Sequence, residues 1–169
     1  MSRPLLVGLH NPLSPEPEFA LYPRPVGCTG WRLFQMLGPA LTERDYLRAF
    51  DRVDLLEHHE QVNGKGYTSR LRRGRIRLIE HVIEGQYTTV VLLGTDVWRA
   101  VLGVPKMRPP WLCWKTVPIV GIRRPMLVRY LTLPHPSGRN RWYQDRVNEA
   151  AAMRALRQLA EISLAEARP

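Results

Sequence analysis

Two loops hold most of the side chains in this sequence that could do chemistry. The first loop begins Val7-Gly8-Leu9-His10-Asn11-Pro12, and the second reads Pro134-His135-Pro136-Ser137-Gly138-Arg139-Asn140. Their imidazole, amide and hydroxyl groups can donate or accept hydrogen bonds, and histidine can also exchange a proton near neutral pH. A structural interpretation also stays open, because Pro-His-Pro is a stiff turn and Asn-Pro is an ordinary turn opener.

Both loops follow short apolar runs that are typical of buried strands. Runs of this kind are rich in Val and Leu, close on loop-forming residues, and cover Leu5–Leu9, Arg52–Leu56, Thr88–Leu93 and Leu127–Leu133. The segment Thr116–Ile122 is a candidate fifth strand, which Pro118 would restrict to an edge of the sheet.

Helical patterns separate these strands. They cover Trp31–Leu37 with Thr29 as its cap, Ser69–Glu84, Thr95–Leu102, and a long final helix from about Arg141 to Ala167. The alternation predicts a single α/β domain over residues 1–169, a three-layer α/β/α sandwich around a central, mostly parallel, four-stranded sheet. Ligands of such sheets bind at the carboxyl ends of the strands, where both loops lie.

Charge favours a nucleic-acid partner. The chain has a formal net charge of +10, and Lys65, Lys106 and Lys115 are the only lysines among its 25 basic residues. The arginine fork suits phosphates and base edges, so the bias predicts binding to single- or double-stranded DNA, although a GC-rich genome would produce the same bias. The Arg-rich run Arg70–Arg77 is compatible with phosphate contacts, or with the solvated face of an amphipathic helix.

The sequence predicts no metal, no cofactor and no membrane partner. Cys28 and Cys113 are too few for an iron–sulfur cluster or a structural zinc site, and His58-His59 lacks the helical spacing of a ligand pair. The N-terminal apolar run breaks at His10, too early for a signal peptide. We therefore expect a cytoplasmic monomer.

The motifs and the strands before them resemble those of the uracil-DNA glycosylase superfamily. That family carries a Gly-x-Asn-Pro-like motif after its first strand and a His-Pro-Ser-like motif after its last, and Val90–Gly94 followed by Trp98 looks like its third strand and the next helix. The resemblance spans the chain from Leu5 to the start of the final helix. It implies an enzyme that hydrolyses, or exchanges, a base in DNA without a cofactor. Compact variants of this kind resemble proteins of bacteriophages and their bacterial hosts, which often process modified bases.

The resemblance also implies catalytic roles. A departing base develops negative charge, and a neutral His135 would donate a hydrogen bond to its oxygen. Asn11 would hold a water near the anomeric carbon of the sugar. Because one residue more than usual separates Gly8 from Asn11, His10 is the alternative group that faces this water.

Other residues would hold the flipped base and the DNA strand. Phe19 or Tyr22 would stack on the base, with Tyr22 preferred because it precedes the turn into the next helix. Gly8 and His10 would lie against the base. Hydroxyl and guanidinium groups are expected to contact DNA at Ser14, Thr29, Ser137, Arg139 and Arg141.

Asp54 is the largest departure from the family, whose members often carry an asparagine on the second strand to read uracil. An ionised aspartate only accepts hydrogen bonds, which favours a modified or non-canonical base with amino or ring N–H donors. A protonated Asp54, its pKa raised by burial, could still read uracil. Asp54 and Asp51 could instead form ion pairs on a solvent-facing edge strand, with Arg52 or a neighbouring arginine as the partner.

Two other functions stay open at this stage. A non-catalytic module of the same fold would bind DNA or a flipped base without turnover. An enzyme acting on free nucleosides or nucleotides would need no broad basic face, and its DNA binding would lack a steep salt dependence.

Overall fold

The protein is built around one five-stranded sheet. The computed structural model describes residues 2–60, 62–104, 107–119, 125–137 and 140–167. The strands occur in the spatial order β2-β1-β3-β5-β4 and span Leu5–Gly8 (β1), Asp51–Asp54 (β2), Thr89–Leu93 (β3), Trp114–Ile119 (β4) and Met126–Leu133 (β5). The prediction of an α/β fold with a mostly parallel sheet is confirmed.

The expectation of four strands is wrong, because β4 adds a fifth. Within the described part of the chain it pairs only with β5, to which it runs antiparallel, while β1, β2, β3 and β5 all run in the same direction. Pro118 lies within β4 and is exposed, as expected at an edge where one side of the strand needs no partner. At the start of β4, the centroid of the Trp114 ring lies 4.6 Å from the Cζ atom of Arg129 in β5.

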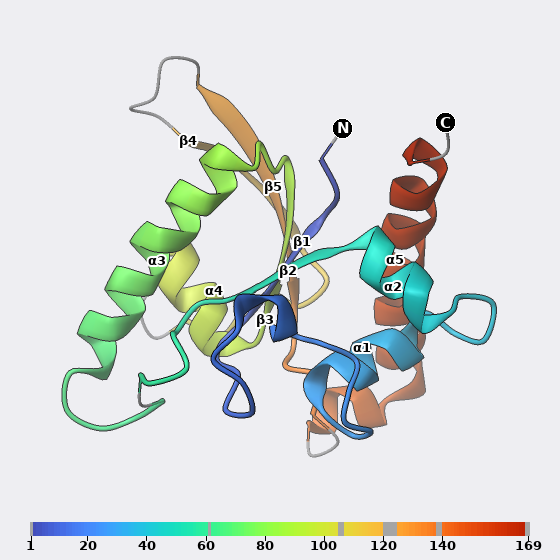
Figure 1. The fold of residues 1–169 in the computed structure, drawn as a ribbon, viewed down its shortest axis with the longest axis horizontal. Coiled ribbons are helices and arrows are strands. Elements are labelled where there is room, and N and C mark those ends of the chain that lie inside the picture. Colours follow the sequence, from blue (N-terminus) through green and yellow to red (C-terminus); the bar gives the residue numbers. More distant parts are fainter. Residues whose placement is uncertain (1, 61, 105–106, 120–124, 138–139, 168–169) are drawn as a thin grey trace.

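Helices cover both faces of the sheet and make three layers (Figure 1). One face carries α3 (Tyr67–Glu84) and α4 (Thr95–Leu102), and the other carries α1 (Thr29–Met36), α2 (Glu43–Ala49) and α5 (Arg146–Glu166). Strand residues alternate between the two cores: Leu5 and Val7 pack on the α3 side, and Leu6 packs on the α1 side. Two short 3₁₀ helices complete the fold, η1 (Pro17–Phe19) and η2 (Arg141–Gln144).

The helices differ from the sequence predictions in three places. Helix α2 was not predicted, although Thr42 and Asp45 form a complete capping box at its start. Cys28, not Thr29, caps α1, since its Sγ accepts from the Trp31 N–H. The final helix is not continuous from Arg141, because Asp145 ends η2 and caps α5.

Because β1, β2, β3 and β5 are parallel, their carboxyl ends lie along the same edge of the sheet. Gly8 pairs in register with Asp54, and Leu93 pairs with Leu133, so the loops that follow these strands meet. Among the described residues, no helix is long and apolar enough to cross a membrane.

Candidate functional site

A cavity of about 370 Å³ opens at the carboxyl ends of β1, β2 and β5. Its wall holds most of the residues that the sequence singled out, although they are far apart in the chain: Gly8, His10, Asn11, Ser14, Phe19, Tyr22, Thr29, Asp54 and His135. The cavity falls within the size range of small-ligand sites. It is the place where the two loops converge.

Two glycines let the elements around the cavity approach each other closely. A side chain on Gly8 would overlap the Oδ1 atom of Asp54 and crowd the Leu21 side chain. A side chain on Gly30 would overlap the backbone carbonyl oxygens of Leu21 and Tyr22. The first turn of α1 therefore packs directly against the loop after β1.

Asp54 presents an unengaged carboxyl group to the cavity. Among the described residues, no hydrogen bond or ion pair reaches its side chain, so the alternative of an ion pair with Arg52 is not realised there. Arg52 instead donates to the backbone oxygens of Ala20 (3.1 Å) and Phe50 (3.2 Å). Burial raises the pKa of Asp54 to about 7, so near neutral pH the group can donate as well as accept.

His135 also lines the cavity, at the start of the loop after β5. Its Nε2 lies 3.4 Å from the Thr29 Oγ1, and its backbone oxygen accepts from the Ser137 N–H (2.8 Å) and the Asn140 Nδ2 (3.0 Å). Partial burial of the ring lowers the pKa of His135, although the residue remains exposed to solvent. The imidazole is therefore neutral at pH 7 and able to donate one hydrogen bond.

The Asn11 side chain organises the loop after β1. Its Nδ2 donates to the Phe19 carbonyl (3.1 Å), and its Oδ1 accepts from the Leu13 N–H (3.0 Å). One N–H and one lone pair of the amide remain for a water or ligand.

A reciprocal histidine contact joins the loops after β1 and β2. The His10 Nε2 lies 2.9 Å from the His58 backbone oxygen, and the His58 Nδ1 lies 3.0 Å from the Asn11 backbone oxygen. Carbonyl oxygens only accept, so both ring nitrogens carry the proton. His58 therefore holds the loop after β1 in place, although His58 and His59 are both exposed.

Phe19 and Tyr22, the two alternatives for the ring that stacks on a base, both lie on the cavity wall. Phe19 and Tyr22 form an edge-to-face contact with ring centroids 5.4 Å apart. The loop that carries them is anchored by Arg52 and by the buried Tyr46 hydroxyl, which donates to the Leu21 carbonyl at 2.8 Å. Neither anchor has a local sequence signal, because both act across more than twenty residues of chain.

The residues expected to contact DNA separate into different surroundings. Thr29 lies beside His135 inside the cavity, while the Ser14 hydroxyl hydrogen-bonds to the Glu16 carboxylate. Ser137 lines a different groove, which also contains Trp31, Arg32 and Asn140. Arg141 is exposed on η2, and Arg139 lies outside the described residues.

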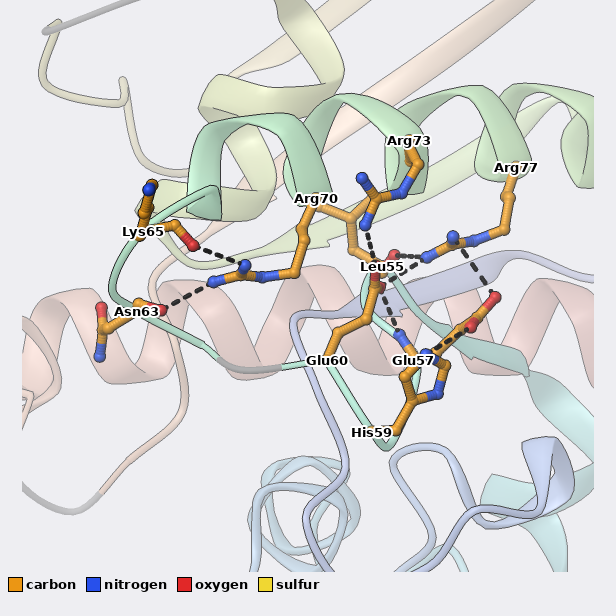
Figure 2. A network of polar contacts seen from close by, with 9 residues as sticks. All are labelled: Leu55, Glu57, His59, Glu60, Asn63, Lys65, Arg70, Arg73 and Arg77. Atoms are coloured by element: carbon orange, nitrogen blue, oxygen red, sulfur yellow. Dashed lines mark hydrogen bonds and ion pairs between the residues drawn. The ribbon is translucent and has the colours of Figure 1, made fainter.

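Most arginines in the α3 run bind the chain itself (Figure 2). Arg70 donates to the backbone oxygens of Asn63 (2.7 Å) and Lys65 (2.9 Å). Arg73 and Arg77 each contact the buried Glu60 at 2.9 Å, and Arg77 also approaches Glu57 at 3.3 Å. These side chains secure the loop that follows β2. Arg72 is exposed on the same helix.

No model of a known protein family matches the chain, and a search of curated proteins gave no significant match. In the part of the chain that the structure describes, no group of three or more His, Cys, Asp or Glu side chains could hold a metal ion.

Proposed function

We propose that the protein removes a base from DNA by hydrolysing its N-glycosidic bond. The observation that carries the proposal is the convergence of His135, Asn11 and Asp54 on one cavity that also holds an aromatic pair. The resemblance of the two loop motifs to the uracil-DNA glycosylase superfamily points to the same chemistry. DNA is the proposed partner because the chain has a net charge of +10.

Each residue has a role that follows from its surroundings. The base leaves the stack and enters the cavity against Phe19 and Tyr22. As the glycosidic bond breaks, the neutral His135 ring donates a hydrogen bond to the oxygen on which negative charge develops. The remaining N–H and lone pair of the Asn11 amide hold the attacking water, which adds to the anomeric carbon as the bond to the base breaks. The water gives up its proton to solvent, and the departing base anion takes up a proton from solvent.

Asp54 is the proposed reader of the base edge. Its carboxyl is unengaged by described residues, and its pKa of about 7 gives it acceptor and donor forms at neutral pH. The acceptor form suits an amino or ring N–H group, so we propose a modified or non-canonical base as the preferred substrate.

One observation favours a non-catalytic binding module as the second candidate. Both ends of the Asn11 amide already hold the loop through Phe19 and Leu13, which is the behaviour of a structural residue. Such a module would bind DNA or a flipped base in the same cavity without breaking a bond.

The test is base release from oligonucleotides that carry uracil, hypoxanthine, xanthine, 5-hydroxymethyluracil or amino-bearing bases, in single and double strands. Abasic sites would be measured by alkaline cleavage for the wild type, His135→Ala and the control His59→Ala. The proposal predicts release by the wild type and the control, and a loss of at least about a hundredfold in His135→Ala. Salt-sensitive binding without release from any oligonucleotide would favour the binding module.

A further inference from the structure

A second cavity adjoins the candidate site. It has a volume of about 410 Å³ and lies between β2, α3 and the loop before η1. Asn11, Ser14 and Asp54 belong to the walls of both cavities. A group bound against Asp54 in the first cavity is therefore next to the second.

The wall of the second cavity is acidic, although the protein as a whole is basic. Its wall carries four glutamates and one arginine, although the chain has a net charge of +10: Glu16, Glu57, Glu80, Glu84 and Arg77. Arg77 is engaged by Glu57 and Glu60. The DNA backbone is a poor occupant, because its phosphates would meet these carboxylates.

Two of the glutamates are available to a ligand. Glu80 and Glu84 are exposed, lie one helical turn apart on α3, and make no hydrogen bond or ion pair within the described part of the chain. Val53, Leu78 and the Gly74 backbone supply an apolar stretch between them and the first cavity. An arm with a short alkyl chain and a terminal amine matches this arrangement, because the alkyl chain would lie on the apolar stretch and the amine would reach the glutamates.

We infer that the second cavity receives an arm carried by the target base, an alkyl chain that ends in a positively charged amine. The inference rests on the proposed function and names its substrate class. The base itself occupies the first cavity, Asp54 lies at the boundary, and the arm extends toward α3. A neutral arm gains only the apolar contact, and an arm that ends in a carboxylate is repelled.

The experiment compares oligonucleotides whose uracil carries, at C5, an aminoallyl arm, a neutral propenyl arm or a carboxyvinyl arm. Base release and, separately, binding by fluorescence polarisation would be measured for the wild type and for Glu80→Gln/Glu84→Gln. The matched control is Glu161→Gln/Glu166→Gln, which removes two exposed carboxylates from α5 on the other side of the sheet.

We expect the aminoallyl arm to be favoured over the propenyl arm by about tenfold, and the carboxyvinyl arm to rank last. The aminoallyl-to-propenyl ratio should fall about threefold in Glu80→Gln/Glu84→Gln, as expected for exposed charges, and stay constant in the control. Release without any preference among the arms would overturn this inference and leave the proposed function standing. No release, with amine-dependent binding lost in Glu80→Gln/Glu84→Gln, would support the cavity and overturn the glycosylase. No release and equal binding of all three arms would overturn both.

Discussion

The Oδ1 atom of Asp54 occupies the space where a side chain on Gly8 would begin. The two residues are register partners at the ends of β2 and β1, so a glycine on one strand makes room for a carboxyl group on the next. This pairing buries the carboxyl without giving it a partner among the described residues. It thereby creates a titratable group inside the candidate site.

Gly8→Ala should cost both stability and function. The new methyl group overlaps the Asp54 carboxyl and crowds Leu21, and overpacking of this kind destabilises a protein by about 1–3 kcal/mol. Chemical denaturation would measure the loss, with the exposed Thr68→Ala as the control. Gly8→Ala combined with Asp54→Ala should recover part of it, because one of the two overlaps is relieved. Additive effects of the two changes would contradict the proposed contact.

Asp54 should make the free energy of unfolding depend on pH. Its pKa rises from 3.8 to about 7 on folding, so the folded state binds more protons between these values and is favoured at low pH. This contribution is complete below about pH 4, is lost as pH rises through about 7, and amounts to at most about 4 kcal/mol. Asp54→Asn should therefore be more stable than the wild type at pH 8, with a smaller difference at pH 5. Parallel stability curves for the two proteins would contradict the raised pKa.

His135 should stay neutral to a lower pH than an ordinary histidine. Burial disfavours its charged form, so the folded state binds fewer protons there and gains stability as pH rises toward 6.5. An NMR titration of the ring resonance, assigned by its absence in His135→Ala, should give a midpoint below 6.5. Base release that needs the neutral ring should persist to the same pH. A midpoint at or above 6.5 would contradict the effect of burial on His135, and a midpoint well above pH 7 would remove the neutral donor from the proposed mechanism at physiological pH.

The sequence was sufficient to predict which loops meet at one edge of the sheet, because its strand signals are local to each strand. Apolar runs such as Leu5–Leu9 predict buried strands. Parallel pairing then brings the carboxyl ends of these strands together, whatever conformation the following loops adopt. The convergence of Asn11, Asp54 and His135 follows from that rule together with the loop motifs.

Contacts between residues that are far apart in the chain could not be predicted from the sequence. His58 and Asn11 are 47 residues apart, and nothing near either residue indicates their contact. The periodicity of α3 identifies its polar face, but gives no sign that the loop around Glu60 folds back to engage it. Helix α2 is only seven residues long, too short for a clear apolar stripe, so its capping box was the one usable signal.

His58 should position the loop that carries His10 and Asn11. His58→Ala removes the donor to the Asn11 carbonyl, so we expect faster amide hydrogen exchange at His10, Asn11 and Leu13 and a lower kcat for base release. His58→Asn, whose amide can still donate, should recover part of the rate. His59→Ala is the matched control, since His59 contacts only the Glu57 carboxylate among the described residues. Unchanged exchange in His58→Ala would show that the loop holds its shape without this contact.

Substitutions of Arg77 and Arg72 should have different effects, the first on stability and the second on DNA binding. Arg77→Met removes one partner of the buried Glu60 and should lower the free energy of unfolding by about 1–3 kcal/mol, with Arg73 limiting the loss. Arg72→Met changes an exposed residue of the same helix and should leave stability within about 0.5 kcal/mol. If Arg72 contacts a phosphate, its replacement should lower the salt dependence of DNA affinity by about one counterion. Identical salt slopes for Arg72→Met and the wild type would exclude that contact, and would direct the search for the DNA surface to Arg32 and Arg141 near the His135 loop.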